Sequence, residues 1–223
     1  MNIFRKILPR AATQIPEPPI ARFLFADTRM AWLWLIVRLY VGYEWITAGL
    51  EKLTGYSFTL DSSFGKPTGF GPWIFGAHDG AAIKGFVNGA LAQANGPHPA
   101  VQGWYASFLQ NVVLPNATVF AYLVTFGEVL IGLGLIFGVL TGIAAFFATF
   151  MNLNFLLAGA VSINPVIGTL ALFLILAWRV AGYYGVDRYL LLVLGTPWTG
   201  SLAKQEKIVA VDRSVPEKTP ALR

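Results

Sequence analysis

The sequence predicts an all-α membrane protein, a bundle of four transmembrane helices with a long external loop that contains two short amphipathic helices. Composition is the first observation: mean hydropathy is +0.60, 56% of residues are apolar and 12% are charged, against about 25% charged in soluble domains. The second observation is four apolar runs of roughly 20 residues, the length that crosses a ~30 Å hydrocarbon core as a helix. These runs are 30–50, 118–139, 143–161 and 166–184.

The absence of cysteine limits the redox chemistry of the chain. Without Cys there is no disulfide, thiolate-held iron–sulfur cluster, C-x-x-C pair or covalently attached haem. Both histidines, His78 and His98, lie outside the four apolar runs, so no pair of intramembrane histidines can hold haem between helices. We therefore expect no haem, iron–sulfur cluster or metal ion.

Residues 1–29 form a predicted cytoplasmic basic arm. The segment carries Arg5, Lys6, Arg10 and Arg22, but it lacks the apolar core of about 7–15 residues that a cleaved signal peptide needs. A docked arm and a solvated tail both fit this composition. We favour the tail, because basic arms mostly orient a membrane protein through the positive-inside bias.

The first predicted helix, 30–50, contains two charges, Arg38 and Glu44. At 3.6 residues per turn, Glu44 shares a stripe with Glu51, whereas Arg38 aligns with Trp45 on another. The two charges therefore need not pair with each other. A charged side chain at the centre of a membrane helix costs about 2.5–3.5 kcal/mol on insertion scales, so each is expected to face a partner or a cavity.

The external loop, 52–116, contains two stretches with an amphipathic pattern, 81–94 and 99–114, separated by a break at 95–97. These stretches predict short helices at or near the bilayer surface. Loops of this length are usually functional, and both a docking surface and a plain cap over the helices remain open.

The other three predicted helices carry further polar residues. Glu128 lies near the middle of 118–139, Asn152 and Asn154 lie in 143–161, and Arg179 lies in the second half of 166–184. Gly134, Gly138 and Gly142 form small-x-x-x-small steps, which allow close helix approach. The domain 30–198 is followed by a polar tail, 199–223, predicted to be mobile.

Basic residues predict the orientation. Both tails are basic, the two short turns lack charge, and the long loop balances its charges. The positive-inside rule therefore places both termini in the cytoplasm and the loop outside. In that topology Arg38, Glu128, Asn152 and Arg179 fall within about one helical turn of the midplane, with Glu44 toward the outer side. This polar set is either an ion-pair clasp between helices or a pocket for a small polar or quinone headgroup.

Several motifs occur together in a specific order: RLYVGYEWITAGLEKL, Lys84-Gly85-Phe86, Trp104-Tyr105, FGEVLIGLGLIFGVLTGIAAF, MNLNFLLAG and AWRVAGYYGVDRYLL. In this order they resemble the DoxX family of four-helix bacterial membrane proteins, over about 30–198, and most closely its DoxD-like branch. That branch is named after a subunit of thiosulfate:quinone oxidoreductase. The resemblance implies a bacterial inner-membrane subunit that passes electrons from a sulfur compound to quinone, together with a partner subunit.

Three functions follow as hypotheses. In a quinone-reactive subunit, Glu44 or Glu128 would exchange protons with the quinone, and Arg38 or Arg179 would stabilise its anionic form. Asn152, Asn154 and Trp45 complete the expected quinone site. The alternatives are a non-catalytic accessory subunit of a respiratory or photosynthetic complex, and a small-solute carrier, which would need a homo-oligomer to enclose a path. Nucleic acid is not an expected partner, because the net charge of +5 lies mainly in the terminal arms, where lipid accounts for it.

Overall fold

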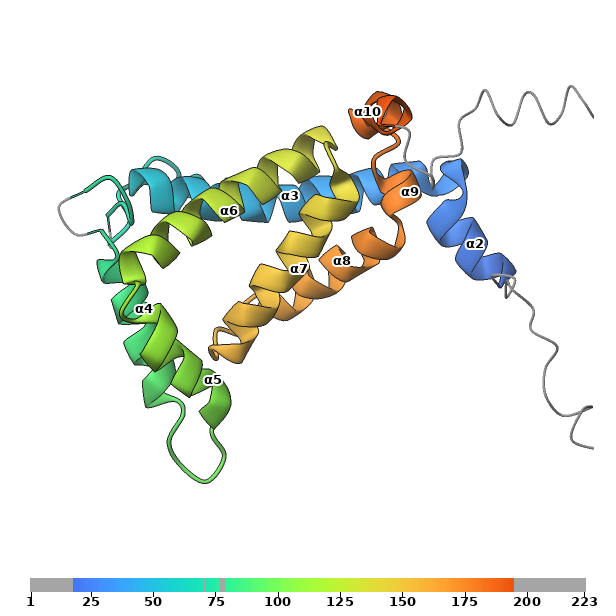
Figure 1. Ribbon diagram of the computed structural model, residues 1–223. Coiled ribbons are helices and arrows are strands. Elements are labelled where there is room, and N and C mark those ends of the chain that lie inside the picture. Colours follow the sequence, from blue (N-terminus) through green and yellow to red (C-terminus); the bar gives the residue numbers. More distant parts are fainter. Residues whose placement is uncertain (1–17, 70, 77–78, 195–223) are drawn as a thin grey trace, which may run out of the picture.

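The computed structural model describes residues 18–69, 71–76 and 79–194. Within these ranges the regular structure is helical, with one isolated antiparallel bridge between Tyr56 and Pro67. Most of the predicted basic arm, as well as the predicted tail at 199–223, lies outside the described residues. Two pairs of long helices meet at one end and diverge, and a third arm of short helices lies across the wide end (Figure 1).

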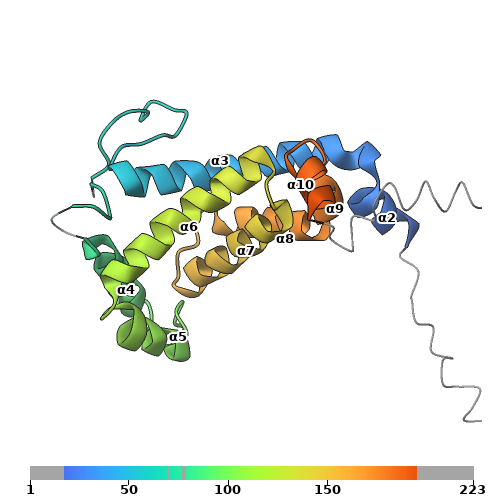
Figure 2. The ribbon, with the colours of Figure 1, turned by 45° about the horizontal axis from the view of Figure 1, so that its top comes forward.

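The first pair is α3 (Ala31–Thr54) and α6 (Ala117–Phe137), which run antiparallel and side by side in both views (Figures 1 and 2). Glycines set their close approach. A Cβ on Gly49 would lie 2.7 Å from the Val129 amide nitrogen, and a Cβ on Gly132 would lie 2.6 Å from that of Ile46. A larger residue at either position would push the two backbones apart.

The second pair is α7 (Thr141–Leu157) and α8 (Asn164–Leu176), followed by the short α9 (Trp178–Ala181). A tight turn links α6 to α7 and contains two residues with left-handed backbone, Gly138 at φ 66° and Leu140 at φ 48°. The two pairs share one hydrophobic core near this turn, which includes Trp34, Leu135 and Leu174. Away from the turn, α7 and α8 diverge from α6 (Figure 1).

The third arm consists of α4 (Ala81–Ala92), α5 (Gly103–Phe108) and the π-helical turn η2 (Leu109–Val113), which leads into α6. Both short helices predicted for the loop are therefore present. Their apolar faces form a second core with the start of α6, in which Val87, Val101 and Ala121 are fully buried. The loop is thus folded against the long helices rather than being a simple connector.

At the other end of α3 lie α2 (Pro19–Ala26) and the 3-10 turn η1 (Thr28–Met30), with α10 (Asp187–Val193) nearby (Figure 1). The Trp34 indole donates a hydrogen bond of 2.7 Å to the Leu24 carbonyl and attaches α2 to α3. Hydrogen bonds from Arg29 to the Asp27 carboxylate begin η1 and lower the pKa of Asp27 to about 2.

One described helix, α6, is long and apolar enough to cross a membrane. α3 is long enough, with 24 residues, but Arg38 and Glu44 interrupt its apolar sequence. α7 and α8 are apolar but have 17 and 13 residues. The prediction of one continuous helix over 166–184 is wrong, because α8 ends at Leu176 and a new turn begins at Trp178.

Candidate functional site

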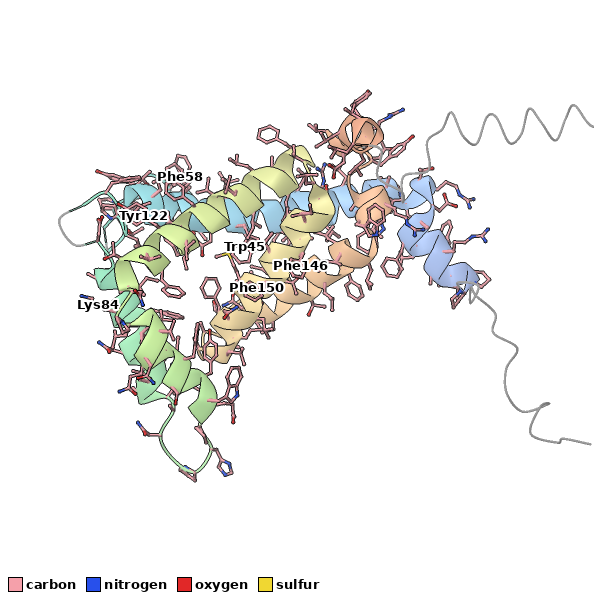
Figure 3. All side chains as sticks on the ribbon, viewed as in Figure 1. Trp45, Phe58, Lys84, Tyr122, Phe146 and Phe150 are labelled. Atoms are coloured by element: carbon pink, nitrogen blue, oxygen red, sulfur yellow. The ribbon has the colours of Figure 1, made fainter. Side chains whose placement is uncertain are left out.

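A large cavity of about 1110 Å³ lies between the two helix pairs. We call it the wedge pocket; residues of α3 and α6 form one wall, residues of α7 and the start of α8 form the other, and residues of α5 line the wide end. Its wall is rich in aromatic side chains: Trp45, Trp73, Phe86, Tyr105, Phe108, Phe120, Phe137, Phe147, Phe150 and Phe155. Figure 3 labels Trp45 and Phe150, which come from the two walls.

An ion pair lies in this aromatic surface. The Lys52 Nζ atom on α3 lies 2.7 Å from Glu128 Oε2 on α6, where the side chain of Glu128 is 2% exposed and that of Lys52 17%. Lys52 Nζ also lies 5.0 Å from the centre of the Trp73 ring, within cation–π range. The pocket therefore contains a positive and a negative group, both largely shielded from solvent.

The partner of Glu128 differs from the one expected from the sequence. The cations in the predicted polar set are Arg38 and Arg179, and the predicted loop begins at residue 52. In the structure α3 continues to Thr54, one turn past the predicted end, which places Lys52 on the helix. The spacing of Glu44, Ala48 and Lys52 at i, i+4 and i+8 puts all three on one helical face, and this signal identifies Lys52 as a pocket residue.

Glu44 and Trp45, both predicted site residues, line the wedge pocket. Glu44 is half-buried, and Trp45 is 5% exposed and stacks on Phe155 with ring centres 6.2 Å apart. The Trp45 indole nitrogen is buried and has no hydrogen-bond partner among the described residues. A buried donor without a partner is costly, so this N–H is available to an acceptor on a bound molecule.

Asn154, also predicted, joins the two sides of the wide end. The Tyr105 hydroxyl on α5 shares its hydrogen between Asn154 Oδ1, at 3.0 Å, and the Asn154 carbonyl oxygen, at 3.1 Å. Burial raises the pKa of Tyr105 to about 12. The tyrosine is therefore a protonated donor at neutral pH, and it contributes a polar group to the pocket wall.

Arg38 lies at a separate site beside the α6–α7 turn. Its guanidinium is buried, donates a hydrogen bond of 3.2 Å from Nη2 to the Tyr184 carbonyl, and packs directly on Gly138. Nearby, the Asp187 carboxylate accepts hydrogen bonds from the backbone nitrogens of Leu140 and Thr141, at 2.5 and 2.7 Å. Fourteen residues separate Arg38 from Lys52 along α3, or about 21 Å of helix, so Arg38 does not reach the pocket.

Two further predicted residues also lie outside the wedge pocket. Asn152 faces α8, where its Nδ2 donates to Asn164 Oδ1 at 3.3 Å and its side chain packs on Gly168. Arg179 is exposed on α9, with its guanidinium 5.5 Å from the centre of the Trp178 ring. Asn152 and Arg179 therefore contact parts of the fold other than the wedge pocket.

The pocket has the chemistry to hold a flat, mostly apolar molecule with a few polar atoms. Aromatic side chains supply flat contact surfaces, Lys52 and Trp45 supply donors, and Glu44 and Asn154 supply acceptors. A large apolar cavity with a few convergent polar groups is the usual form of a small-molecule site. No group of three His, Asp or Glu side chains that could hold a metal ion occurs in the described part of the chain.

The comparison with protein families gives a match over the same region. The family model described as DoxX matches residues 33–160, more than half of the chain. No curated protein and no solved structure matches the chain. The matched segment extends from α3 to the end of α7 and includes Lys52 and Glu128.

Proposed function

The chain belongs to the DoxX family, and from this premise we propose that it is the membrane subunit of a quinone-linked oxidoreductase, with the quinone bound in the wedge pocket. The observation that carries the proposal is the Lys52–Glu128 ion pair within an aromatic cavity whose wall also contains Trp45. The finer assignment is a DoxD-like subunit of a thiosulfate:quinone oxidoreductase. It rests on the motifs of the sequence.

We propose that the protein lies in a bacterial inner membrane with α3, α6, α7 and the α8–α9 segment crossing it. The termini are then cytoplasmic and the loop with α4 and α5 is external. The apolar surface supports this arrangement, since Ile36, Phe146 and Leu153 are each more than half exposed. Contact of such side chains with acyl chains is more favourable than contact with water.

The residues of the pocket have separate roles in this proposal. Lys52 and Trp45 donate to the carbonyl oxygens of the headgroup, and aromatic rings pack on its faces. Glu128 and Glu44 hold and release protons beside it. When bound, a quinone supplies reversible uptake of two electrons and two protons.

The electron donor in this proposal binds a partner subunit. The chain has no cysteine, so it has no thiolate to accept sulfane sulfur and no thiolate ligand for an iron–sulfur cluster. The folded arm of α4 and α5 provides an ordered surface outside the bilayer for such a partner. The proteins that copurify with the chain identify this partner as a membrane subunit or a peripheral subunit.

The proposal is tested by purifying the full chain in mild detergent and titrating it with a short-chain ubiquinone while recording tryptophan fluorescence. Trp45 and Trp73 both line the pocket, so binding should quench emission with saturation. Glu128→Gln should weaken binding at least tenfold, and Arg179→Gln, which lies outside the pocket, should leave it unchanged. Equal, non-saturating quenching of all three proteins would contradict the proposal.

A non-catalytic accessory subunit is the second candidate. It is favoured by the way Lys52–Glu128 links α3 to α6 and Tyr105–Asn154 links α5 to α7, since both contacts hold the fold together. Under this alternative the chain copurifies with a large complex, carries no quinone, and loses assembly rather than quinone affinity when Glu128 is replaced.

A further inference from the structure

The wedge pocket has an apolar part that the proposed headgroup site does not use. The groups assigned to the headgroup, Lys52, Trp45 and Glu128, come from α3 and the middle of α6. Beyond them, α6, α7 and the turn between these helices contribute pocket-lining residues within 130–151, and all of these residues are apolar. We call the part of the pocket that they line the seam groove.

The seam groove is open at the surface of the protein. Leu130 on α6 and Phe147 and Phe150 on α7 line the pocket, and each is nevertheless half exposed or more. A side chain that lines a cavity and is also this exposed lies at the mouth of the cavity. The groove therefore opens along the line between α6 and α7, and its rim is aliphatic and aromatic.

Close contact between α6 and α7 ends the enclosed part of the groove. A Cβ on Gly134 would lie 3.0 Å from the Cβ of Ala144, so the two helices leave no free space between them at this level. The pocket lining continues past this contact to Phe137 and Ile143, which are both more than half exposed. A molecule that follows the groove therefore passes from the interior to the outer surface.

The cavity is larger than a headgroup requires. Pockets for drug-sized ligands measure about 300–1,000 Å³, whereas the wedge pocket measures about 1110 Å³. A single quinone ring beside Lys52 would leave the seam groove unfilled. The groove follows α6 from Glu128 to Phe137, which is about 14 Å of helix. Because cavities with apolar walls do not hold ordered water, the occupant of the groove is itself apolar and elongated.

We propose that the seam groove holds the aliphatic chain of the ligand whose polar head lies beside Lys52 and Glu128, and that this chain leaves the pocket between α6 and α7. The ligand is then an amphiphile with a flat polar head and a long isoprenoid or alkyl chain, not a small free solute. In the proposed membrane arrangement the mouth of the groove faces acyl chains, so the ligand enters from the bilayer. The inference rests on the proposed function for the identity of the head.

Two neighbouring phenylalanines on α7 provide a matched pair for the test. Phe147 lines the seam groove and is 50% exposed, whereas Phe146, labelled in Figure 3, is 55% exposed and does not line the pocket. Each is replaced in turn by the photoreactive analogue p-benzoylphenylalanine in the full chain, which is kept in its native membrane. After irradiation, the molecules cross-linked to each position are identified by mass spectrometry.

The analogue at Phe147 should capture mainly one long-chain isoprenoid quinone, enriched at least tenfold over the adducts at Phe146, which should be the bulk phospholipids. Capture of one different long-chain amphiphile at Phe147 would support the seam groove and contradict the proposed function. The same phospholipid mixture at both positions, or no adduct at Phe147, would overturn the inference. The titration with short-chain ubiquinone would then decide the proposed function separately.

A second measurement compares ubiquinones of two chain lengths on the purified protein. Phe147→Ala should weaken the binding of decylubiquinone about fivefold and leave a ubiquinone with one isoprenoid unit unaffected, because only the longer chain reaches this side chain. Phe146→Ala should change neither affinity. Each ligand is compared between variants, so its partition into detergent cancels. Equal weakening of both ligands by Phe147→Ala, or of neither, would contradict the seam groove as the site of the chain.

Discussion

The guanidinium of Arg38 occupies the space that a side chain at Gly138 would need. Arg38 lies on α3 and Gly138 ends α6, so this contact packs the first helix directly against the turn from which α7 begins. The turn can accept the guanidinium because residue 138 has no Cβ and has a φ of 66°.

Gly138→Ala should therefore destabilise the protein. The new Cβ would clash with the Arg38 guanidinium, and the alanine would have to keep a left-handed backbone conformation. These two effects together should lower the free energy of unfolding by about 2–4 kcal/mol. Thermal unfolding of the detergent-solubilised protein measures this cost. Gly85→Ala on α4 is the control, since no atom lies within 4 Å of its added Cβ; it should be neutral or slightly stabilising.

Lys52→Met should be more destabilising than the double variant Lys52→Met with Glu128→Leu. The single change leaves the Glu128 carboxylate, 2% exposed, without its counter-charge, which typically costs about 3–5 kcal/mol. The double change removes both charges and should recover most of that loss. A double-mutant cycle on unfolding free energies checks this; equal losses in the single and double variants would show that the pair does not stabilise the fold.

Tyr105→Phe should change how stability depends on pH at the alkaline end. The folded pKa of Tyr105 is about 12 and the ordinary value is 10, so between these values the unfolded chain has lost a proton that the folded chain keeps. The stability contributed by Tyr105 is thus complete below pH 10 and is lost as pH rises toward 12.

The measurement is the difference in unfolding free energy between wild type and Tyr105→Phe at several pH values from 8 to 12. We expect this difference to be constant up to about pH 10 and then to shrink. The subtraction cancels the titration of other tyrosines. A constant difference over the whole range would contradict the assignment of this titration to Tyr105.

Asp187→Ala should loosen the start of α7. The Asp187 carboxylate accepts two backbone N–H groups there, and its loss would leave buried donors without partners, at about 1–3 kcal/mol. Asp187→Asn keeps one acceptor oxygen and should lose less. Hydrogen exchange at the amides of Leu140 and Thr141 measures this loosening locally and should become faster in Asp187→Ala. Unchanged protection of these two amides would contradict the prediction.

The helical class and most helix positions could be predicted from hydropathy. The apolar runs at 118–139 and 143–161 correspond to α6 and α7 within a few residues, and the amphipathic stretches of the loop correspond to α4 and α5. These features are encoded locally, in runs and periodic patterns. The break after Leu176 has no such signal, because the apolar sequence continues across it into Ala177 and Trp178.

The site was predicted only in part, because the choice of partners depends on how helices pack. Glu128, Glu44, Trp45 and Asn154 were found as polar or aromatic residues in apolar runs, and all line the wedge pocket. Arg38 was included for its depth, but it lies about 21 Å along α3 from Lys52, the partner of Glu128. Lys52 was missed, because four residues at the end of α3 decided whether it belonged to the helix or the loop.

The unequal lengths of the helices have a consequence for the surrounding lipid. In the proposed membrane arrangement α6, with 21 residues, spans about 32 Å, whereas α7, with 17 residues, spans about 26 Å. A ~30 Å hydrocarbon core matches the first and exceeds the second. Thinning of the bilayer beside α7 would remove this mismatch, so acyl-chain length becomes a variable that acts on one wall of the protein more than on the other.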